Sequence, residues 1–195
     1  MPRTVLGERF ASAVAYASEV HASQDRKGTG IPYVAHLLGV TSLVLEAGGD
    51  EDLAIAALLH DAAEDHGGER RLADIASRFG ARVAGIVRDC SDSLTDEGAA
   101  KQDWETRKRE HLARLADAPD EVLVVWMADK VHNGRAIVTD LGVEGPAAMA
   151  RFNAAPDRIL WYYTSNLALA ERREVPAMLR VALAQVVESL TSSLA

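Results

Sequence analysis

Apolar residues recur at three- and four-residue intervals along most of the chain. Phe10, Val14 and Ala17, for example, fall on one face of a helix predicted for residues 4–22. Asp50 follows two glycines and is expected to cap the next helix. The same periodicity predicts further helices over these ranges: 32–47, 51–65, 71–79, 81–90, 101–116, 119–140, 147–173 and 175–193. The sequence therefore predicts an all-α fold, with a single domain over residues 1–195.

The segment after Pro119 also fits a strand. Its first half, VLVVWM, is rich in β-branched residues, which favour strands by propensity. Val122 and Trp126 nevertheless share one helical face with Asp129. We therefore expect a helix here, with Asp129 on its apolar face.

Composition and charge narrow the class of protein. The 195 residues are 48% hydrophobic, a proportion typical of a folded domain. Lysine and arginine number 21 against 29 aspartates and glutamates, and the formal net charge of −8 argues against broad nucleic-acid binding. No run approaches the roughly 20 apolar residues that span a bilayer, so no membrane partner is expected. Cys90 has no second cysteine for an internal disulfide, which fits a reducing cytoplasm.

The stretch ALLHDAAEDHGG, residues 57–68, turns abruptly from apolar to ionisable. Its first ionisable residues are His60, Asp61, Glu64 and Asp65. On a helix these span about 140° of surface and continue the stripe of small apolar residues before them, so we expect them to face the interior. Acidic residues at the end of a helix would also oppose its dipole. Partly buried carboxylates beside a histidine need a compensating charge, which a divalent metal ion supplies.

Two other segments repeat this anomaly. Asp129 interrupts the apolar run VLVVWMADKVHN, and Asn133 follows one turn later on the same face. His36 lies in PYVAHLLGV, on the face shared with Val40 and Leu43. One such residue is usually a buried hydrogen-bonding group, but three helices with inward polar residues indicate a common site. Imidazole and carboxylate donors together suit manganese, iron, cobalt or zinc better than calcium.

Three segments, KGTGIPYVAH, AALLHDAAEDH and ADKVHNGRA, occur in this order and together resemble one family. They are similar to the hydrolase domain of the RelA/SpoT family, within the HD superfamily of metal-dependent phosphohydrolases. Its stand-alone forms are the small alarmone hydrolases, which include a metazoan SpoT homologue. The resemblance implies an all-α bundle that uses manganese and water to remove the 3′-pyrophosphate from guanosine tetra- or pentaphosphate (ppGpp or pppGpp). The products would be GDP or GTP and pyrophosphate.

The resemblance also assigns roles to individual residues. The positions matched to metal ligands are His36, His60, Asp61 and Asp129. The positions matched to the acidic pair that assists attack by water are Glu64 and Asp65. The positions matched to substrate contacts or to basic residues of the family are Arg26, Lys27, Lys130, Asn133 and Arg135. The ligand set implies one divalent ion, manganese by resemblance, and a small guanosine nucleotide as the partner.

The chain departs from the family pattern at SDSL, residues 91–94, where bifunctional members carry a TKL-like stretch. The loss of a basic position near Asp92 leaves another nucleotide open as the substrate, such as NADPH with its 2′-phosphate. A catalytically silent nucleotide sensor is the alternative from a different class. The presence of Glu64 and Asp65 beside a full ligand set argues against a sensor, because binding does not require a water-activating pair.

Two other histidines are expected outside the site. His66 is predicted at a helix end or on the surface, and His111, in KREHLARL, on an exposed helix. These placements favour one metal ion over two. A homo-oligomer is compatible with the sequence.

Overall fold

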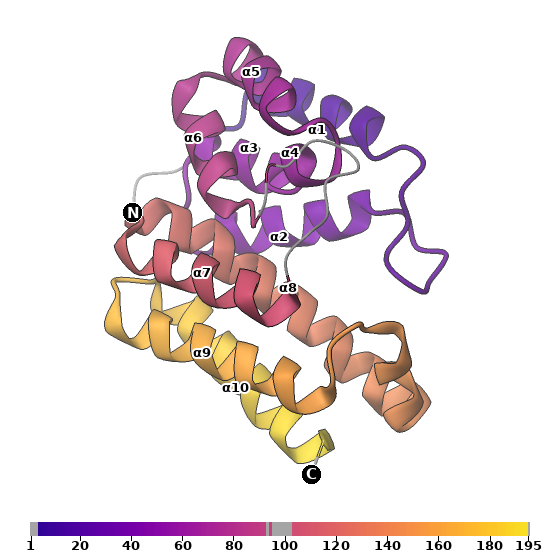
Figure 1. Cartoon of the computed structure of the whole chain (residues 1–195). Helices are drawn as coiled ribbons and strands as arrows, with labels where there is room; N and C mark the ends of the chain where they lie inside the picture. Colours follow the sequence, from indigo (N-terminus) through magenta and orange to yellow (C-terminus); the bar gives the residue numbers. More distant parts are fainter. Residues whose placement is uncertain (1–3, 93, 95–102, 195) are drawn as a thin grey trace. The chain divides into compact units, whose positions relative to one another are not determined.

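Helices provide the regular structure of the chain (Figure 1). The computed structural model describes residues 4–92, 94 and 103–194, and within these ranges it contains helices and no strand. Asp25 and Pro32 form an isolated antiparallel bridge. The all-α prediction is confirmed. The chain divides into two compact units, residues 1–102 and 103–195, and the prediction of a single domain stays a prediction.

The first unit is built around one short, largely buried helix. Its helices are α1 (Glu8–Val20), α2 (Val34–Glu46), α3 (Glu51–Leu59), α4 (Ala62–Asp65), α5 (Gly68–Phe79) and α6 (Ala81–Cys90). Every residue of α3 from Leu53 to Leu59 is buried, and the helix contacts α1, α2 and α6. Asp50 caps it as expected, because its Oδ1 accepts a hydrogen bond from the backbone N–H of Leu53 at 2.9 Å.

One predicted helix is interrupted within the ionisable cluster. The sequence predicts a continuous helix over residues 51–65, but the structure divides it into α3 and α4. Asp61, with φ −96° and ψ −8°, precedes α4 as its N-cap residue. Glu64 and Asp65 therefore lie in the first turn of α4, where the helix dipole favours negative charge. The break removes the conflict with the dipole that a continuous helix would have produced.

The second unit is organised along the long helix α8 (Asp120–Glu144). Its other elements are α7 (Trp104–Asp117), the 3-10 helix η1 (Gly145–Arg151), α9 (Pro156–Arg172) and α10 (Ala177–Leu194). The strand alternative for α8 is excluded, and the helix contacts α9, α10 and η1. The helix predicted for 147–173 divides into η1 and α9, with Pro156 in the first turn of α9. A Cβ at Gly134 would lie 2.3 Å from Val186 Cγ1, so this glycine permits the close approach of α8 and α10.

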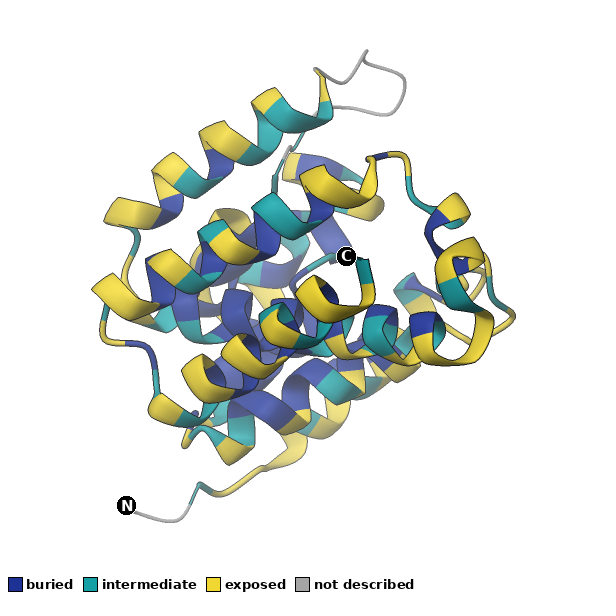
Figure 2. Cartoon of the chain, turned by 90° about the horizontal axis from the view of Figure 1, so that it is seen from below, coloured by how far each residue is buried: buried dark blue, intermediate teal, exposed yellow. Residues whose placement is uncertain are grey.

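Buried residues line one side of many helices and exposed residues the other (Figure 2). In α7 the buried stripe is narrow and consists of His111 and Leu115, one turn apart. The prediction that His111 lies on the surface is therefore wrong, because it is fully buried and its ring centroid lies 4.3 Å from that of Trp126. Because charged residues adjoin His111 in the sequence, a buried stripe of only two residues is not visible there. No helix in the described part of the chain has the length and apolarity needed to cross a membrane.

Candidate metal centre

Two imidazoles and one carboxylate converge in the first unit. His36 comes from α2, and His60 and Asp61 come from the break between α3 and α4. His60 Nε2 lies 2.9 Å from Asp61 Oδ2, and His36 Nε2 lies 3.7 Å from the same oxygen. Both histidines are buried, with ring centroids 5.3 Å apart. The helix break thus brings together three of the residues matched to metal ligands.

Hydrogen bonds determine which atoms face this centre. His60 Nδ1 lies 2.8 Å from the carbonyl oxygen of Ala57, so Nδ1 carries the proton and Nε2 presents its lone pair. This is the arrangement in which histidine commonly binds a metal. The hydroxyl of Tyr33 donates to Asp61 Oδ2 at 2.5 Å. The donor set fits a divalent ion that accepts both nitrogen and oxygen ligands.

The acidic pair lies on α4, just beyond the break. Glu64 Oε2 accepts a hydrogen bond from the backbone N–H of Asp92 at 2.8 Å. Asp65 Oδ2 accepts one from the side-chain amide of Gln24 at 2.8 Å. Asp65 is exposed as a residue, but partial desolvation of its carboxylate and the nearby Asp61 carboxylate raise its pKa, although the bond from Gln24 opposes the rise.

The loop between α1 and α2 carries the predicted basic residues. Arg26 is half-buried and Lys27 is exposed. The loop folds back on itself, because Arg26 N donates to Ile31 O at 2.8 Å and Thr29 N donates to Arg26 O at 3.0 Å. Gly28, with φ 73°, adopts the left-handed conformation that the turn requires. Backbone hydrogen bonds therefore define the position of Arg26.

In the second unit the predicted residues lie along α8. Asp129 is buried, accepts a hydrogen bond from Asn133 Nδ2 at 2.5 Å and lies 2.5 Å from Lys130 Nζ. Lys130 is also buried, with Nζ 3.7 Å from the centroid of the Trp126 ring. Burial alone would lower the pKa of Lys130, but the Asp129 carboxylate raises it well above its ordinary value, so the ammonium group stays charged. Arg135 is exposed on the same helix.

Two aspects of the predicted site stay predictions. One is the convergence of Asp129 with His36, His60 and Asp61 on a single ion. The other concerns SDSL, because Ser93 lies outside the described residues.

Contacts around the centre involve residues that sequence reasoning did not single out, namely His21, Gln24 and Tyr33. Gln24 Nε2 reaches Asp65, and the Tyr33 hydroxyl reaches Asp61. His66 follows α4 as its C-cap residue, as predicted, but its Nε2 also lies 2.8 Å from Gln24 Oε1. These positions flank a basic loop and show no helical periodicity. Their polar character just before His36 is the signal that could have found them.

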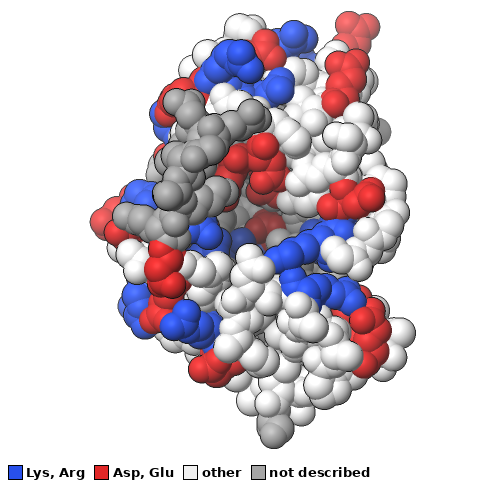
Figure 3. Space-filling view, turned by 45° about the vertical axis from the view of Figure 1, so that its right-hand side comes forward, with Lys and Arg blue, Asp and Glu red and all other residues white. Residues whose placement is uncertain are grey.

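Charge is mixed over the face of the molecule in Figure 3. Among the side chains drawn in colour there, basic and acidic residues are interspersed. This distribution agrees with the formal net charge of −8.

Comparisons with known proteins place this geometry in a family. The profile described as "HD domain" matches residues 13–151. A guanosine-3′,5′-bis(diphosphate) 3′-pyrophosphohydrolase of Aquifex aeolicus is 36% identical over 127 residues, covering 65% of this chain and 17% of that protein. The corresponding Drosophila melanogaster enzyme, MESH1, is 34% identical over 141 residues, covering 71% of this chain and 72% of that protein. The chain thus spans most of the stand-alone relative and a small part of the longer one.

A solved structure agrees with the sequence relatives. It is that of a metazoan SpoT orthologue described as hydrolysing ppGpp and as playing a role in starvation responses. It is similar to this chain with a TM-score of 0.74 and 29% identity, covering 95% of this chain and 97% of that one.

Proposed function

The chain belongs to the HD-domain family, and on this premise we propose that it is a metal-dependent 3′-pyrophosphohydrolase of ppGpp. The observation that carries the proposal is the convergence of the His36 and His60 Nε2 atoms on Asp61 Oδ2. The likeness to the Drosophila melanogaster enzyme, which extends over 72% of that protein, supports the choice of substrate. The pentaphosphate pppGpp is the second substrate of the same reaction.

The proposed cofactor is one Mn²⁺ ion held by His36, His60, Asp61 and Asp129. The lone pair that His60 presents and the mixed nitrogen and oxygen donors support this choice. When bound, such an ion supplies a Lewis acid that makes water a stronger nucleophile and offsets phosphate charge. Asp129 belongs to this set by its match to the family and by its burial.

The proposed reaction breaks one P–O bond of the substrate and transfers a proton to the acidic pair. A water oxygen attacks the phosphorus of the 3′-pyrophosphate that is joined to the ribose, and the bond from this phosphorus to O3′ breaks. Pyrophosphate leaves, O3′ takes a proton, and GDP remains. Glu64 or Asp65 receives the proton that the water loses.

The basic residues are assigned to the nucleotide. Arg26, Lys27 and Arg135 offset the charge of the phosphates through charge-assisted hydrogen bonds. Lys130 and Asn133 hold the Asp129 carboxylate in the structure, so nucleotide contacts by these two residues would share or replace those bonds.

The proposed setting is the cytoplasm, with a small nucleotide as partner and no nucleic acid. The net charge of −8 and the single cysteine support this assignment. One domain over residues 1–195 and a homo-oligomer are both compatible with it.

NADPH is the second candidate substrate, with loss of its 2′-phosphate. The observation that favours it is the sequence SDSL, because Asp92 stands near a basic position of the family and donates its backbone N–H to Glu64. A substrate with less phosphate charge would tolerate an acidic residue there better than ppGpp.

A hydrolysis panel tests the proposal. Wild-type protein with Mn²⁺ is incubated with ppGpp, pppGpp, NADPH and deoxynucleotides, and the products are identified by mass spectrometry. Release of GDP and pyrophosphate from ppGpp is expected, and Asp61→Ala should abolish it while the exposed Asp157→Ala leaves it unchanged. If only NADPH is hydrolysed, NADPH replaces ppGpp as the substrate. If no nucleotide is hydrolysed, the proposed hydrolase activity is refuted and the catalytically silent sensor is the reading that is left.

A further inference from the structure

Gln24 is hydrogen-bonded at both ends of its side-chain amide. Its Oε1 lies 2.6 Å from His21 Nδ1 and 2.8 Å from His66 Nε2. Its Nε2 donates to Asp65 Oδ2 at 2.8 Å. One amide thus joins two histidines that lie far apart in the sequence to a member of the acidic pair.

The chemistry of the partners determines which way the amide points. An ionised carboxylate only accepts hydrogen bonds, so the NH₂ group of Gln24 must face Asp65. The oxygen then faces both imidazoles, and each imidazole has to donate. His21 must therefore carry its proton on Nδ1, and His66 must carry one on Nε2. Burial lowers the pKa of His21, which keeps its ring neutral and makes Nδ1–H its single donor.

Two hydrogen bonds hold the backbone of Gln24 in place. Gln24 N donates to His21 O at 3.0 Å, and Gln24 O accepts from Tyr33 N at 2.9 Å. Side-chain rotation is then the main freedom left to Gln24, and the two imidazoles restrict it. A glutamine held in this way gives up little further rotamer freedom when it binds a carboxylate.

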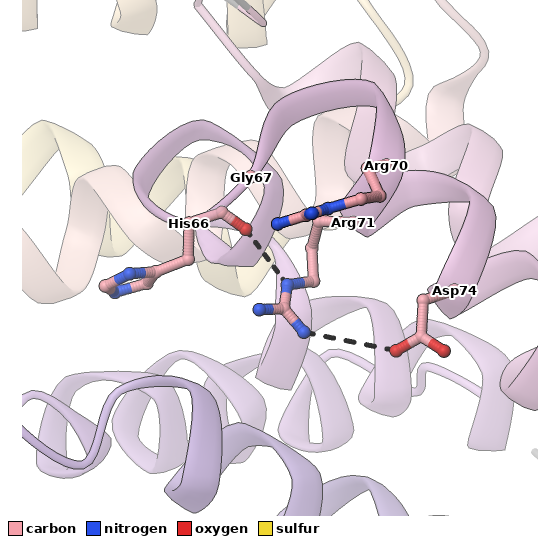
Figure 4. A pocket seen from close by; sticks show the side chains of 5 residues that line it. All are labelled: His66, Gly67, Arg70, Arg71 and Asp74. Atoms are coloured by element: carbon pink, nitrogen blue, oxygen red, sulfur yellow. Dashed lines mark hydrogen bonds and ion pairs between the residues drawn. The ribbon is translucent and has the colours of Figure 1, made fainter. Parts of the chain in front are cut away.

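His66 is anchored in turn by Arg71. Arg71 Nε donates to the carbonyl oxygen of His66 at 2.9 Å, and Arg71 NH1 donates to the hydroxyl of Tyr16 at 2.9 Å. Figure 4 shows the His66 carbonyl turned toward Arg71 and the imidazole turned away from it. The space around Arg71 is a cavity of about 320 Å³ lined by His66, Gly67, Arg70, Arg71 and Asp74. The bond to Arg71 therefore fixes the direction from which His66 reaches Gln24.

The same cluster supports the metal centre. The ring of His21 stacks on that of Tyr33, with centroids 5.1 Å apart and an interplanar angle of 25°. The Tyr33 hydroxyl donates to Asp61 Oδ2 at 2.5 Å. His21 is itself buried, which restricts its motion, so it helps to hold both Tyr33 and Gln24 in position. His21 contacts Tyr33, which binds Asp61, and it also contacts Gln24, which binds Asp65.

We propose that Gln24, oriented by His21 and His66, is a positioning residue that holds the Asp65 carboxylate for proton transfer during hydrolysis. This inference rests on the proposed function, because it assigns Asp65 a part in the reaction. An aspartate that ends a one-turn helix has several rotamers, and the Gln24 bond selects one of them. The effect should appear in the chemical step, since Gln24 need not touch the nucleotide.

The first test separates positioning from binding and folding. Gln24→Met keeps the length of the side chain but removes both hydrogen-bonding functions. With ppGpp and Mn²⁺, kcat should fall about tenfold, a part of the 10²–10⁴-fold contribution typical of acid–base catalysis, while KM and metal content change less than about twofold. His66→Ala, which removes one of the two donors, should lower kcat by a smaller factor. The exposed Gln185→Met is the matched control and should leave kcat unchanged.

The second test needs no substrate. Long-range ¹⁵N–¹H spectra of the imidazoles should report the Nδ1–H tautomer for His21 and an Nε2–H for His66, and Gln24→Met should shift both signals. If wild-type protein hydrolyses ppGpp but Gln24→Met keeps kcat within twofold, the positioning role is refuted. If wild-type protein hydrolyses no nucleotide, the proposed function fails. In that case the opposite tautomers would also refute the Gln24 geometry, and the expected tautomers would support it.

Discussion

Gly134 offers a direct test of how α8 is packed in the second unit. The glycine lies in ADKVHNGRA, directly after Asn133 and five residues after Asp129. A Cβ at this position would lie 2.3 Å from Val186 Cγ1 and 2.8 Å from Tyr163 Cε1. Ordinary carbon contacts are about 3.5–4.0 Å, so both neighbours would have to move. Both are buried, and the β-branched valine has few alternative rotamers.

The size of the effect follows from two opposing contributions. Overpacking of a core costs about 1–3 kcal/mol, and replacing glycine by alanine within a helix returns up to about 1 kcal/mol. Because 2.3 Å is far shorter than a carbon contact, the cost should lie in the upper part of that range, about 2–3 kcal/mol, so Gly134→Ala should lower the free energy of unfolding by about 1–2 kcal/mol. Gly142, on the same helix, has no described atom outside its own helix within 4 Å of such a Cβ, so Gly142→Ala should raise the free energy of unfolding by up to about 1 kcal/mol.

Thermal unfolding followed by circular dichroism compares the two variants. For a chain of this length about 1 kcal/mol corresponds to roughly 2–4 °C in Tm, so the variants should melt at least several degrees apart. The order of their Tm values is the decisive result. Equal shifts, or a more stable Gly134→Ala protein, would refute the close packing of α8 against Val186 and Tyr163.

Three further predictions address the site and its support. Glu64→Gln should retain Mn²⁺ and nucleotide binding but lower kcat by about 10²-fold or more. The control Glu188→Gln, on α10, should leave kcat unchanged. Loss of Mn²⁺ from Glu64→Gln would instead make Glu64 a metal ligand. Arg26→Ala should raise KM for ppGpp with the metal still bound, and unchanged kinetics, as expected for the exposed Arg180→Ala, would remove Arg26 from the site. Asp50→Ala should lower the free energy of unfolding by about 1 kcal/mol at pH 7, because it removes the cap of α3. Although burial opposes it, hydrogen bonds from Leu53 and Arg82 lower the pKa of Asp50 below 3.8, so this contribution is complete above pH 3.8 and is lost as pH falls through the folded-state pKa. A urea titration at several pH values checks that difference, and a constant difference would contradict it.

Helical periodicity was sufficient to predict most of the fold. The segment around Val122 and Trp126 shows why, because its face pattern indicates a helix although its β-branched residues favour a strand. Val122, Trp126 and Asp129 are all buried, which agrees with the pattern. His36, His60 and Asp61 were predicted as site residues for the same reason, since polar residues on an otherwise apolar face are visible in the sequence, and the structure brings these three together.

Two features could not be derived from local patterns. The break between α3 and α4 falls in LLHDAAED, which contains neither glycine nor proline, so its one sequence signal is Asp61, a residue type common at helix N-caps, with Glu64 three residues later. His111 is buried by its contact with Trp126, a residue of a different helix that its own charged neighbours do not reveal. Besides these two features, the proposed role of Gln24 depends on His66 and Asp65, residues that lie far from it in the sequence.

The position of a bound metal ion tests the central claim most directly. Crystals of the protein grown with Mn²⁺ can be measured near the manganese absorption edge, where anomalous scattering identifies the ion. We predict one peak per chain, with His36 Nε2, His60 Nε2 and carboxylate oxygens of Asp61 and Asp129 as its ligands. A peak elsewhere, a peak without Asp129 among its ligands, or no peak in the presence of saturating Mn²⁺ would contradict the proposed metal centre.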